Sequence, residues 1–271
     1  MVRKIVLYII VVLFFASCTE YSRVIKNGTN DEKYALALKL YDKKDYVRSV
    51  TLLEDLLAVY RGKEKSEEIY LKYAYCYYGL GQYELAAFHF KNFTENYYNS
   101  KYMEECSYRY VSCLYLNALP YYLDQTNTTK AISEIQLFLN QYPESQYKDF
   151  CNNHLEELRK SLKTKAFQGA MLYFKLEDYL AAITSFKNAI RDYPDIENKE
   201  EIEYMIVKAS YLFAKNSIEE KKEERYEAVF TEYKEYIRNN KVGSVHFEDV
   251  ASYNEKAKVE LTKHKKLNKI Q

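Results

Sequence analysis

The stretch Asp178–Pro194, DYLAAITSFKNAIRDYP, decides the fold of this chain. An aromatic residue in a turn, Tyr179, is followed three residues later by the small residue Ala182, and the bulky Phe186 comes four residues after that. Side chains three and four residues apart lie on one face of an α-helix, so the stretch predicts an amphipathic helix. Pro194 then ends the segment, because proline cannot continue a helix.

The same pattern occurs in four other segments. They are DYVRSVTLLEDLL (45–57), QYELAAFHFKNF (82–93), TKAISEIQLFLNQYP (129–143), which lacks the aromatic residue, and RYEAVFTEYKEYI (225–237). The position of the small residue falls at Ser49, Ala86, Ala131, Ala182 and Val229, with spacings of 37, 45, 51 and 47 residues. Self-similar segments at such spacings predict repeated helix pairs, in which each pair buries its apolar face against the next.

The segments resemble the second helix of a tetratricopeptide repeat. The segment at 178–194 fills all four of that motif's defining positions, and the segment at 129–143 fills them more loosely. Ala37, Ala74 and Ala170 fall where the first helices of the motif approach a neighbour closely. The resemblance implies an all-α fold, a tetratricopeptide-repeat α-solenoid of about five helix pairs with a C-terminal capping helix at 246–267. The spacings exceed the motif length of about 34 residues, so we expect extensions at 117–128, 144–176 and 215–224.

The composition favours a helical protein without an active site. Only 6 Gly and 3 Pro occur in 271 residues, too few turn residues for a β-sandwich or a doubly wound fold. The formal net charge of +1 gives no electrostatic footprint for nucleic acid. The four histidines lie far apart in sequence and none has metal-ligand spacing. We therefore expect no enzyme activity, no metal and no cofactor.

The N-terminus reads MVRKIVLYIIVVLFFASC and predicts an export signal. Arg3 and Lys4 precede an apolar run of 11 residues, which is too short to span a membrane but suits a signal peptide. Cys18 after Ala16-Ser17 resembles a bacterial lipobox, although Phe15 stands where Leu is commonest. The resemblance implies cleavage before Cys18 and a diacylglycerol and an acyl chain on that residue. The alternative is an ordinary signal peptide with a chance cysteine.

The residue after the predicted lipidation site bears on the destination of the protein. Thr19 stands there in place of the Asp that retains lipoproteins in the inner membrane, and the acid-rich stretch that sends some lipoproteins to the cell surface is missing. We therefore expect a lipid anchor in the outer membrane, with the protein facing the periplasm.

Four further cysteines would then lie in an oxidising compartment. Cys106 and Cys113 are seven residues apart on one predicted helix, about 10 Å along its axis, which is too far for a disulfide. Cys76 could pair with either of them. The interpretation that we favour is that all four, Cys151 included, are small buried apolar residues between helices.

The lipobox and the repeats together resemble the BamD family, the outer-membrane lipoproteins of the β-barrel assembly machinery, in a form like that of Bacteroidota. The matching segments are the Leu123–Asn127 loop, the Asn140–Pro143 and Arg191–Asp195 segments that close repeats three and four, the turn at 60–62, and residues 74–78. The resemblance implies a non-catalytic scaffold that binds the POTRA domains of the barrel protein BamA mainly through its C-terminal half. It also implies that the N-terminal half recognises unfolded outer-membrane proteins.

This resemblance divides the chain and suggests contact residues. We expect a signal peptide at 1–17, a lipidated linker at 18–30, repeats one to three at 31–143, and repeats four and five with the capping helix at 144–271. The groove positions of repeats one and two, predicted to contact a substrate peptide, are Tyr34, Leu38, Tyr41, Leu71, Tyr75 and Tyr78. Packing between repeats, or simple exposure to solvent, is the alternative role of these residues. Arg191 is the predicted partner contact, and its alternative role is an interaction with the helix C-terminus.

Two other functions are compatible with repeats of this type. An envelope or division coordinator usually carries a coiled coil before its repeats, whereas here the repeats begin near Asp31 without a heptad segment. A glycan-binding lipoprotein of the SusD kind is much longer and stacks Trp on sugars, whereas this chain has no Trp. Both alternatives therefore fit the sequence less well than the assembly lipoprotein.

Overall fold

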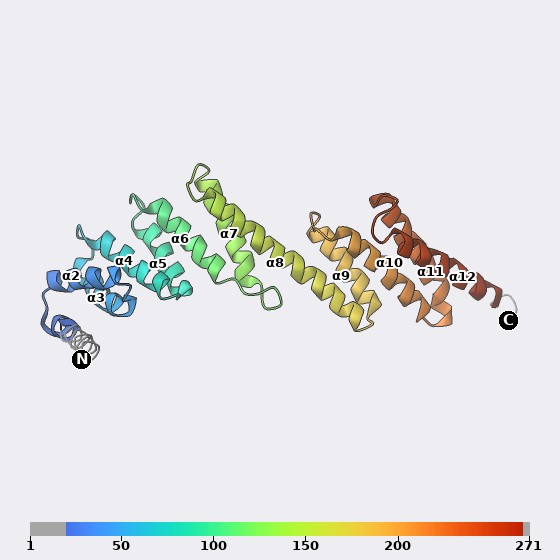
Figure 1. The fold of residues 1–271 in the computed structure, drawn as a ribbon, viewed down its shortest axis with the longest axis horizontal. Helices are drawn as coiled ribbons and strands as arrows, with labels where there is room; N and C mark the ends of the chain where they lie inside the picture. Colours follow the sequence, from blue (N-terminus) through green and yellow to red (C-terminus); the bar gives the residue numbers. More distant parts are fainter. Residues whose placement is uncertain (1–19, 268–271) are drawn as a thin grey trace, which may run out of the picture. The chain divides into compact units, whose positions relative to one another are not determined.

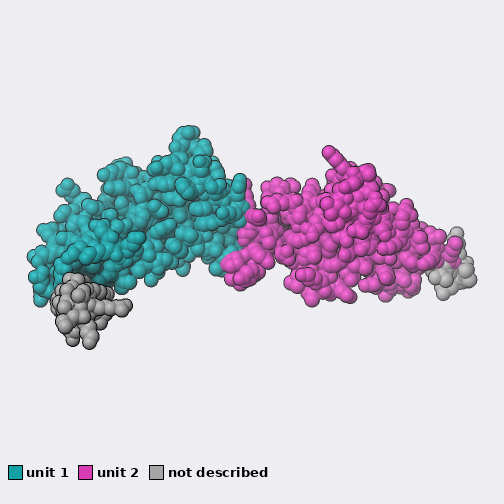
Figure 2. Space-filling view, in the orientation of Figure 1, with its two compact units in different colours: residues 1–119, 124–158 teal, residues 120–123, 159–271 magenta. Residues whose placement is uncertain are grey.

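The computed structural model describes residues 20–267, which fold into two compact units. Unit 1 comprises the described residues up to Leu119 together with Asp124–Leu158, and unit 2 comprises Pro120–Leu123 and the described residues from Arg159 onward (Figure 2). Within 20–267 the regular structure is helical and contains no strand. The predicted signal peptide at 1–17 and the predicted lipidation site, Cys18, lie outside the described residues.

Unit 1 is a stack of three antiparallel helix pairs (Figure 1). The helices are α2 (Asn30–Asp42), α3 (Tyr46–Tyr60), α4 (Ser66–Gly79), α5 (Tyr83–Asn96), α6 (Met103–Leu116) and α7 (Thr126–Gln141). The first helix of each pair packs on the second, and α3 with α4 and α5 with α6 join successive pairs. The N-terminal part of α8 (Lys148–Lys175) completes this unit.

Unit 2 continues the same plan with α8 and four further helices. These are α9 (Tyr179–Asp192), α10 (Lys199–Lys215), α11 (Glu219–Asn239) and α12 (Phe247–Leu267). Helix α10 packs on α9 and α11, and α12 covers α11 and α10 at the C-terminal end. The predicted plan of five helix pairs and a capping helix is therefore confirmed.

A recurring turn joins the two helices in three of the pairs. Lys44, Gly81 and Glu177 each have a positive φ, of 61°, 71° and 61°, and each is followed by a polar residue and then a tyrosine that starts the second helix. In two of the turns an aspartate caps that helix: Asp45 accepts from the backbone N–H of Arg48, and Asp178 from that of Ala181. In these three repeats the aromatic residue that marks the repeat in the sequence is thus the first residue of the second helix, whereas Tyr226 lies inside α11.

The small residues of the repeat pattern lie where helices approach each other most closely. Ser49, Ala86, Ala131, Ala182 and Val229 are all fully buried, and so are the corresponding residues of the first helices, Ala37, Ala74 and Ala170. Packing at this density leaves no room for a larger side chain. The four cysteines from Cys76 to Cys151 are also buried and unpaired, as the favoured interpretation predicted.

Two boundaries differ from those expected from the sequence. The units divide within α8, at residues 158 and 159, and not at 143 and 144, because Cys151, Leu155 and Leu158 belong to the core of unit 1. The expected linker at 18–30 is helical over 20–27. Val24 of this segment is buried against the first repeat, where the periodic side chains of Tyr21 and Ile25 accompany it.

In three repeats, a glutamate near the start of the first helix forms a hydrogen bond with the loop that follows the second helix. Ser100 donates to Glu67 and Ser145 donates to Glu104, both at 2.6 Å. Glu200 of α10 accepts from the backbone N–H of His246 at 3.0 Å and from the hydroxyl of the buried Tyr236 at 2.9 Å. These contacts tie the start of each first helix to the turn that follows the second helix.

The contacts of Glu200 predict a loss of stability in acid. The hydrogen bond from the His246 backbone, with those from Tyr236 and Ser244, holds the pKa of Glu200 below its ordinary value of 4.5. A lowered folded-state pKa stabilises the protein above the unfolded pKa, and this contribution is lost as the pH falls through the folded value. We expect Glu200→Gln to cost on the order of 1 kcal/mol at pH 7 and to flatten the decline of the unfolding free energy below about pH 5. Urea unfolding between pH 3 and 7 measures both effects. Glu201→Gln, an exposed carboxylate in the same turn, is the control, and an equal flattening there would contradict the assignment.

Candidate binding surfaces

The side chains at the predicted groove positions of α2 lie half-buried along one side of unit 1. Tyr34 and Tyr41 border the core of the first repeat, and Leu38 lies between them. The Tyr41 ring meets Tyr46 edge to face at 5.6 Å, and Lys72 Nζ of α4 lies 4.3 Å from the Tyr41 ring centroid. Burial raises the pKa of Tyr41 to about 12, so its hydroxyl is protonated at neutral pH.

Tyr75 and Tyr78 of α4 surround an arginine of the next first helix. The Tyr75 hydroxyl donates to the Glu105 carboxylate and accepts from Arg109 Nε at 3.1 Å. The guanidinium carbon of Arg109 lies 5.5 Å from the Tyr75 ring centroid and 5.3 Å from that of Tyr78. Tyr108 supplies a third ring at 5.5 Å. Burial, together with Glu105, raises the pKa of Tyr75, which keeps the hydroxyl as a donor.

These contacts join three first helices into one surface. We call it the first-helix face and define it by Tyr41, Lys72, Tyr75, Tyr78 and Arg109. All five side chains are half-buried.

Leu71, predicted to contact a substrate peptide, is almost fully buried. Its side chain is 6% exposed and belongs to the core cluster of unit 1 together with Phe93 and Cys106. Because this cluster contains residues of α5 and α6, Leu71 contributes to packing between repeats and presents almost no surface to a ligand. For Leu71 the alternative role, packing between repeats, is the one that the structure supports.

Sequence reasoning missed Lys72 and Arg109. The signal was present, because both cations occupy the same place in successive first helices, 37 residues apart, as do Glu67 and Glu104. An alignment of α4 with α6 in this register would have found them. Lys72 lies one residue after the predicted groove position Leu71, and Arg109 one residue after Tyr108, the corresponding residue of the next first helix.

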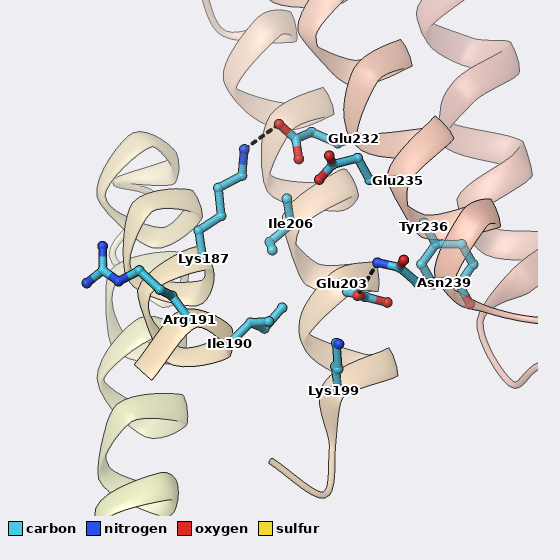
Figure 3. A pocket seen from close by; sticks show the side chains of 10 residues that line it. All are labelled: Lys187, Ile190, Arg191, Lys199, Glu203, Ile206, Glu232, Glu235, Tyr236 and Asn239. Carbon is cyan, nitrogen blue, oxygen red and sulfur yellow. Dashed lines mark hydrogen bonds and ion pairs between the residues drawn. The ribbon is translucent and has the colours of Figure 1, made fainter. Parts of the chain in front are cut away.

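A pocket of about 270 Å³ lies in unit 2 between α9, α10 and α11 (Figure 3). Ile190, Ile206 and Tyr236 form its apolar part. The polar lining residues are Lys187, Arg191, Lys199, Glu203, Glu232, Glu235 and Asn239. Lys187 pairs with Glu232 across the pocket at 2.6 Å, and Glu203 accepts from the side-chain amide of Asn239 at 2.8 Å. The pocket therefore combines an apolar floor with charges of both signs.

Arg191, the predicted partner contact, lies at the rim of this pocket. Its side chain is 71% exposed and its Nε donates to Asp192 at 3.0 Å. Figure 3 shows its guanidinium on the side of α9 away from Glu203 and Tyr236. The residue lies in the last turn of α9, but the C-terminal carbonyl of Ala189 is satisfied by the backbone N–H of Tyr193 and not by the arginine. The side chain is thus available to a partner.

Neither a metal site nor a membrane span is found in the part of the chain that the structure describes. Within 20–267, no three His, Cys, Asp or Glu side chains gather closely enough to hold a metal ion. None of the helices in that range combines the length and the apolar character that a membrane span requires. A second pocket, of about 790 Å³, lies in unit 1 and is lined by residues around the turn at 61–64 together with Tyr70 and Tyr97. The binding functions argued below concern the first-helix face and the pocket of unit 2.

Comparison with known proteins identifies the family. The tetratricopeptide domain of P58(IPK), in a crystal structure at 2.5 Å, matches with a TM-score of 0.40 and 15% identity, covering 89% of this chain and 68% of that one. A likeness at this score adds nothing to the fold that the helix pairs already show. No curated protein matches the chain. Residues 26–226, well over half of the chain, match the YfiO family, which is described as an outer membrane lipoprotein. With its stacked helix pairs, the chain belongs to this family of scaffold lipoproteins of the outer membrane, the BamD family.

Proposed function

We propose that the chain is a non-catalytic scaffold of the outer-membrane β-barrel assembly machinery. In this role it binds the POTRA domains of a BamA-type barrel protein and holds unfolded outer-membrane proteins. The observation that carries the proposal is the family match over residues 26–226. Lipid chains on Cys18 would anchor the protein in the outer membrane with its helices in the periplasm.

The pocket of unit 2 supports the contact to the barrel protein. Its volume of about 270 Å³ falls below the roughly 300–1,000 Å³ of most small-molecule sites, but it accommodates a side chain that projects from a protein surface. An apolar floor with charges around it resembles the centre and rim of a protein interface. Arg191, exposed at the rim, suits a carboxylate of the partner, because its planar guanidinium can donate two parallel hydrogen bonds.

The first-helix face of unit 1 supports the contact to unfolded chains. Its tyrosines, together with Tyr34 and Leu38 of α2, offer half-buried apolar surface with polar edges, which suits an extended peptide that alternates apolar and polar residues. In a stack of helix pairs, the first helices line the concave binding surface. Leu71 is left out of this set because it is buried.

Pull-down from detergent-solubilised envelope, with a C-terminal tag and mass spectrometry, tests the proposal. Stoichiometric recovery of a barrel protein with POTRA domains is the expected result. Recovery of division proteins or of glycan-uptake proteins in its place would leave the helical stack intact and overturn the function.

Arg191→Glu is expected to lower recovery of the barrel protein at least tenfold. The substitution places a negative charge where a carboxylate of the partner is expected, and like charges at an interface are strongly unfavourable. A tenfold loss corresponds to about 1.4 kcal/mol. Arg238→Glu is a matched control, because Arg238 is also an arginine in the last turn of a unit 2 helix and its side chain is 73% exposed. If Arg191 acted only on the helix dipole, Arg191→Glu would cost about 0.3–1 kcal/mol of stability and leave recovery unchanged.

A further inference from the structure

We infer that the first-helix face of unit 1 binds an acidic segment of an extended peptide, with Arg109 and Lys72 as its carboxylate-binding residues. The inference rests on the proposed function, in which the same face receives unfolded chains. It adds a charge requirement to that function, and it assigns the requirement to two residues.

Arg109 is a half-buried cation without a carboxylate partner. Its one hydrogen bond is donated by Nε to the Tyr75 hydroxyl, and none of the ion pairs among the described residues includes it. The nearest acid in this network, Glu105, is bound to the opposite side of that hydroxyl. A guanidinium removed from water loses hydration, and the three tyrosine rings around Arg109 replace only part of it. Its two terminal nitrogens remain able to form the fork that a carboxylate accepts.

Lys72 repeats this arrangement one repeat earlier. It is half-buried, its ammonium lies 4.3 Å from the Tyr41 ring centroid, and none of the ion pairs among residues 20–267 includes it. Other lysines of the same unit do find carboxylates: Lys33 pairs with Asp55 at 2.7 Å and Lys39 with Glu20 at 2.9 Å. The two half-buried cations of the first-helix face thus have no carboxylate partner among the described residues, whereas Lys33 and Lys39 of α2 do.

The chemistry of the face selects a peptide as the occupant. Tyrosine rings and hydroxyls between the two cations suit an extended chain, whose side chains can contact rings and whose backbone can bond to hydroxyls. A formal net charge of +1 over the whole chain does not suit a polyphosphate backbone. First helices of successive repeats lie on the order of 10 Å apart, and an extended chain rises about 3.3 Å per residue. Side chains of an extended chain alternate between its two faces, so two carboxylates four residues apart lie on one face, about 13 Å apart along the chain. Their flexible side chains could therefore reach both cations.

Peptide binding to the purified mature chain, measured by fluorescence anisotropy, tests the inference. The probe is an extended, Tyr- and Val-rich peptide with two glutamates four residues apart, on one face of the chain, and an amidated C-terminus. A matched control peptide carries glutamine in place of both glutamates. We expect the glutamate peptide to bind at least tenfold more tightly, with an advantage that shrinks as salt rises. Arg109→Gln and Lys72→Gln should each remove most of this advantage, and Arg109→Lys should keep part of it.

Matched variants and peptides separate the outcomes. Lys91→Gln removes an exposed lysine of α5 whose ammonium lies over the Tyr110 ring, outside the first-helix face. This substitution should leave the advantage of the glutamate peptide intact. Equal binding of both peptides to the unaltered protein would overturn the inference and leave the proposed function standing. Binding of neither would overturn the inference and also the substrate role of this face. If a free C-terminus restored tight binding to the glutamine peptide, the face would recognise a terminal carboxylate, and the assignment to acidic side chains would be wrong.

Discussion

Phe90→Ala is expected to lower the unfolding free energy of unit 1 by about 3–5 kcal/mol. Phe90 is fully buried on α5 and meets Tyr75 edge to face at 5.1 Å. Removing its ring deletes a large apolar surface and leaves a cavity beneath the first-helix face, and surrounding helices collapse into such a cavity only in part. Because Tyr75 rests on this ring, the substitution should also disturb the Arg109 network.

Phe88→Ala provides a control that changes the same residue type two positions away. Phe88 is 58% exposed, so its removal should change stability by no more than about 0.5 kcal/mol. Stacked repeats can unfold in parts, so the measurement is hydrogen exchange of the α4–α6 amides together with urea unfolding. A loss below about 1 kcal/mol for Phe90→Ala, or equal losses for the two variants, would show that this ring does not support the core.

The helix pairs could be predicted from the sequence because their signal is local and repeated. A small residue such as Ala86 or Ala182 must lie where two helices meet, and the bulky residues must follow at helical spacing. Both alanines are fully buried in the structure. The same local rules predicted the capping helix, and the scarcity of glycine and proline excluded the main alternatives to a helical fold.

The unit boundary and the cations could not be predicted in this way. A periodic pattern in α8 predicts a long helix but does not show that Leu158 packs with unit 1 while Ala170 packs with unit 2. The burial of Leu71 depends on α6, which lies more than 30 residues away in sequence. The pairing of Lys72 and Arg109 with tyrosine rings depends on side chains from different repeats. Each of these features is set by tertiary packing, and the position of a residue in a sequence motif does not reveal such packing.

Cys18→Ala is expected to abolish lipid attachment and stable membrane anchoring. A thiol is required to form the thioether with diacylglycerol, and cleavage before residue 18 follows that step in the lipobox pathway. One acyl chain alone gives marginal, reversible binding, with an association constant of about 10⁴ M⁻¹, whereas two or more chains anchor a protein stably. The variant should therefore lose label from a clickable fatty acid completely and retain residues 1–17 as a longer precursor.

Mass spectrometry of the N-terminus, with fractionation of the envelope, distinguishes the two interpretations of this cysteine. In a lipoprotein, the unaltered chain begins at a triacylated Cys18, and Cys18→Ala leaves the outer-membrane fraction. With an ordinary signal peptide and a chance cysteine, the substitution would change neither processing nor fractionation. Cys76→Ala is the control, because Cys76 of α4 is buried in the core shared with the first repeat. Retention of the label by Cys76→Ala, with its loss in Cys18→Ala, would place the anchor at the N-terminus. The helix at 20–27, docked on the first repeat through Val24, would then follow the lipid after a single residue, Thr19.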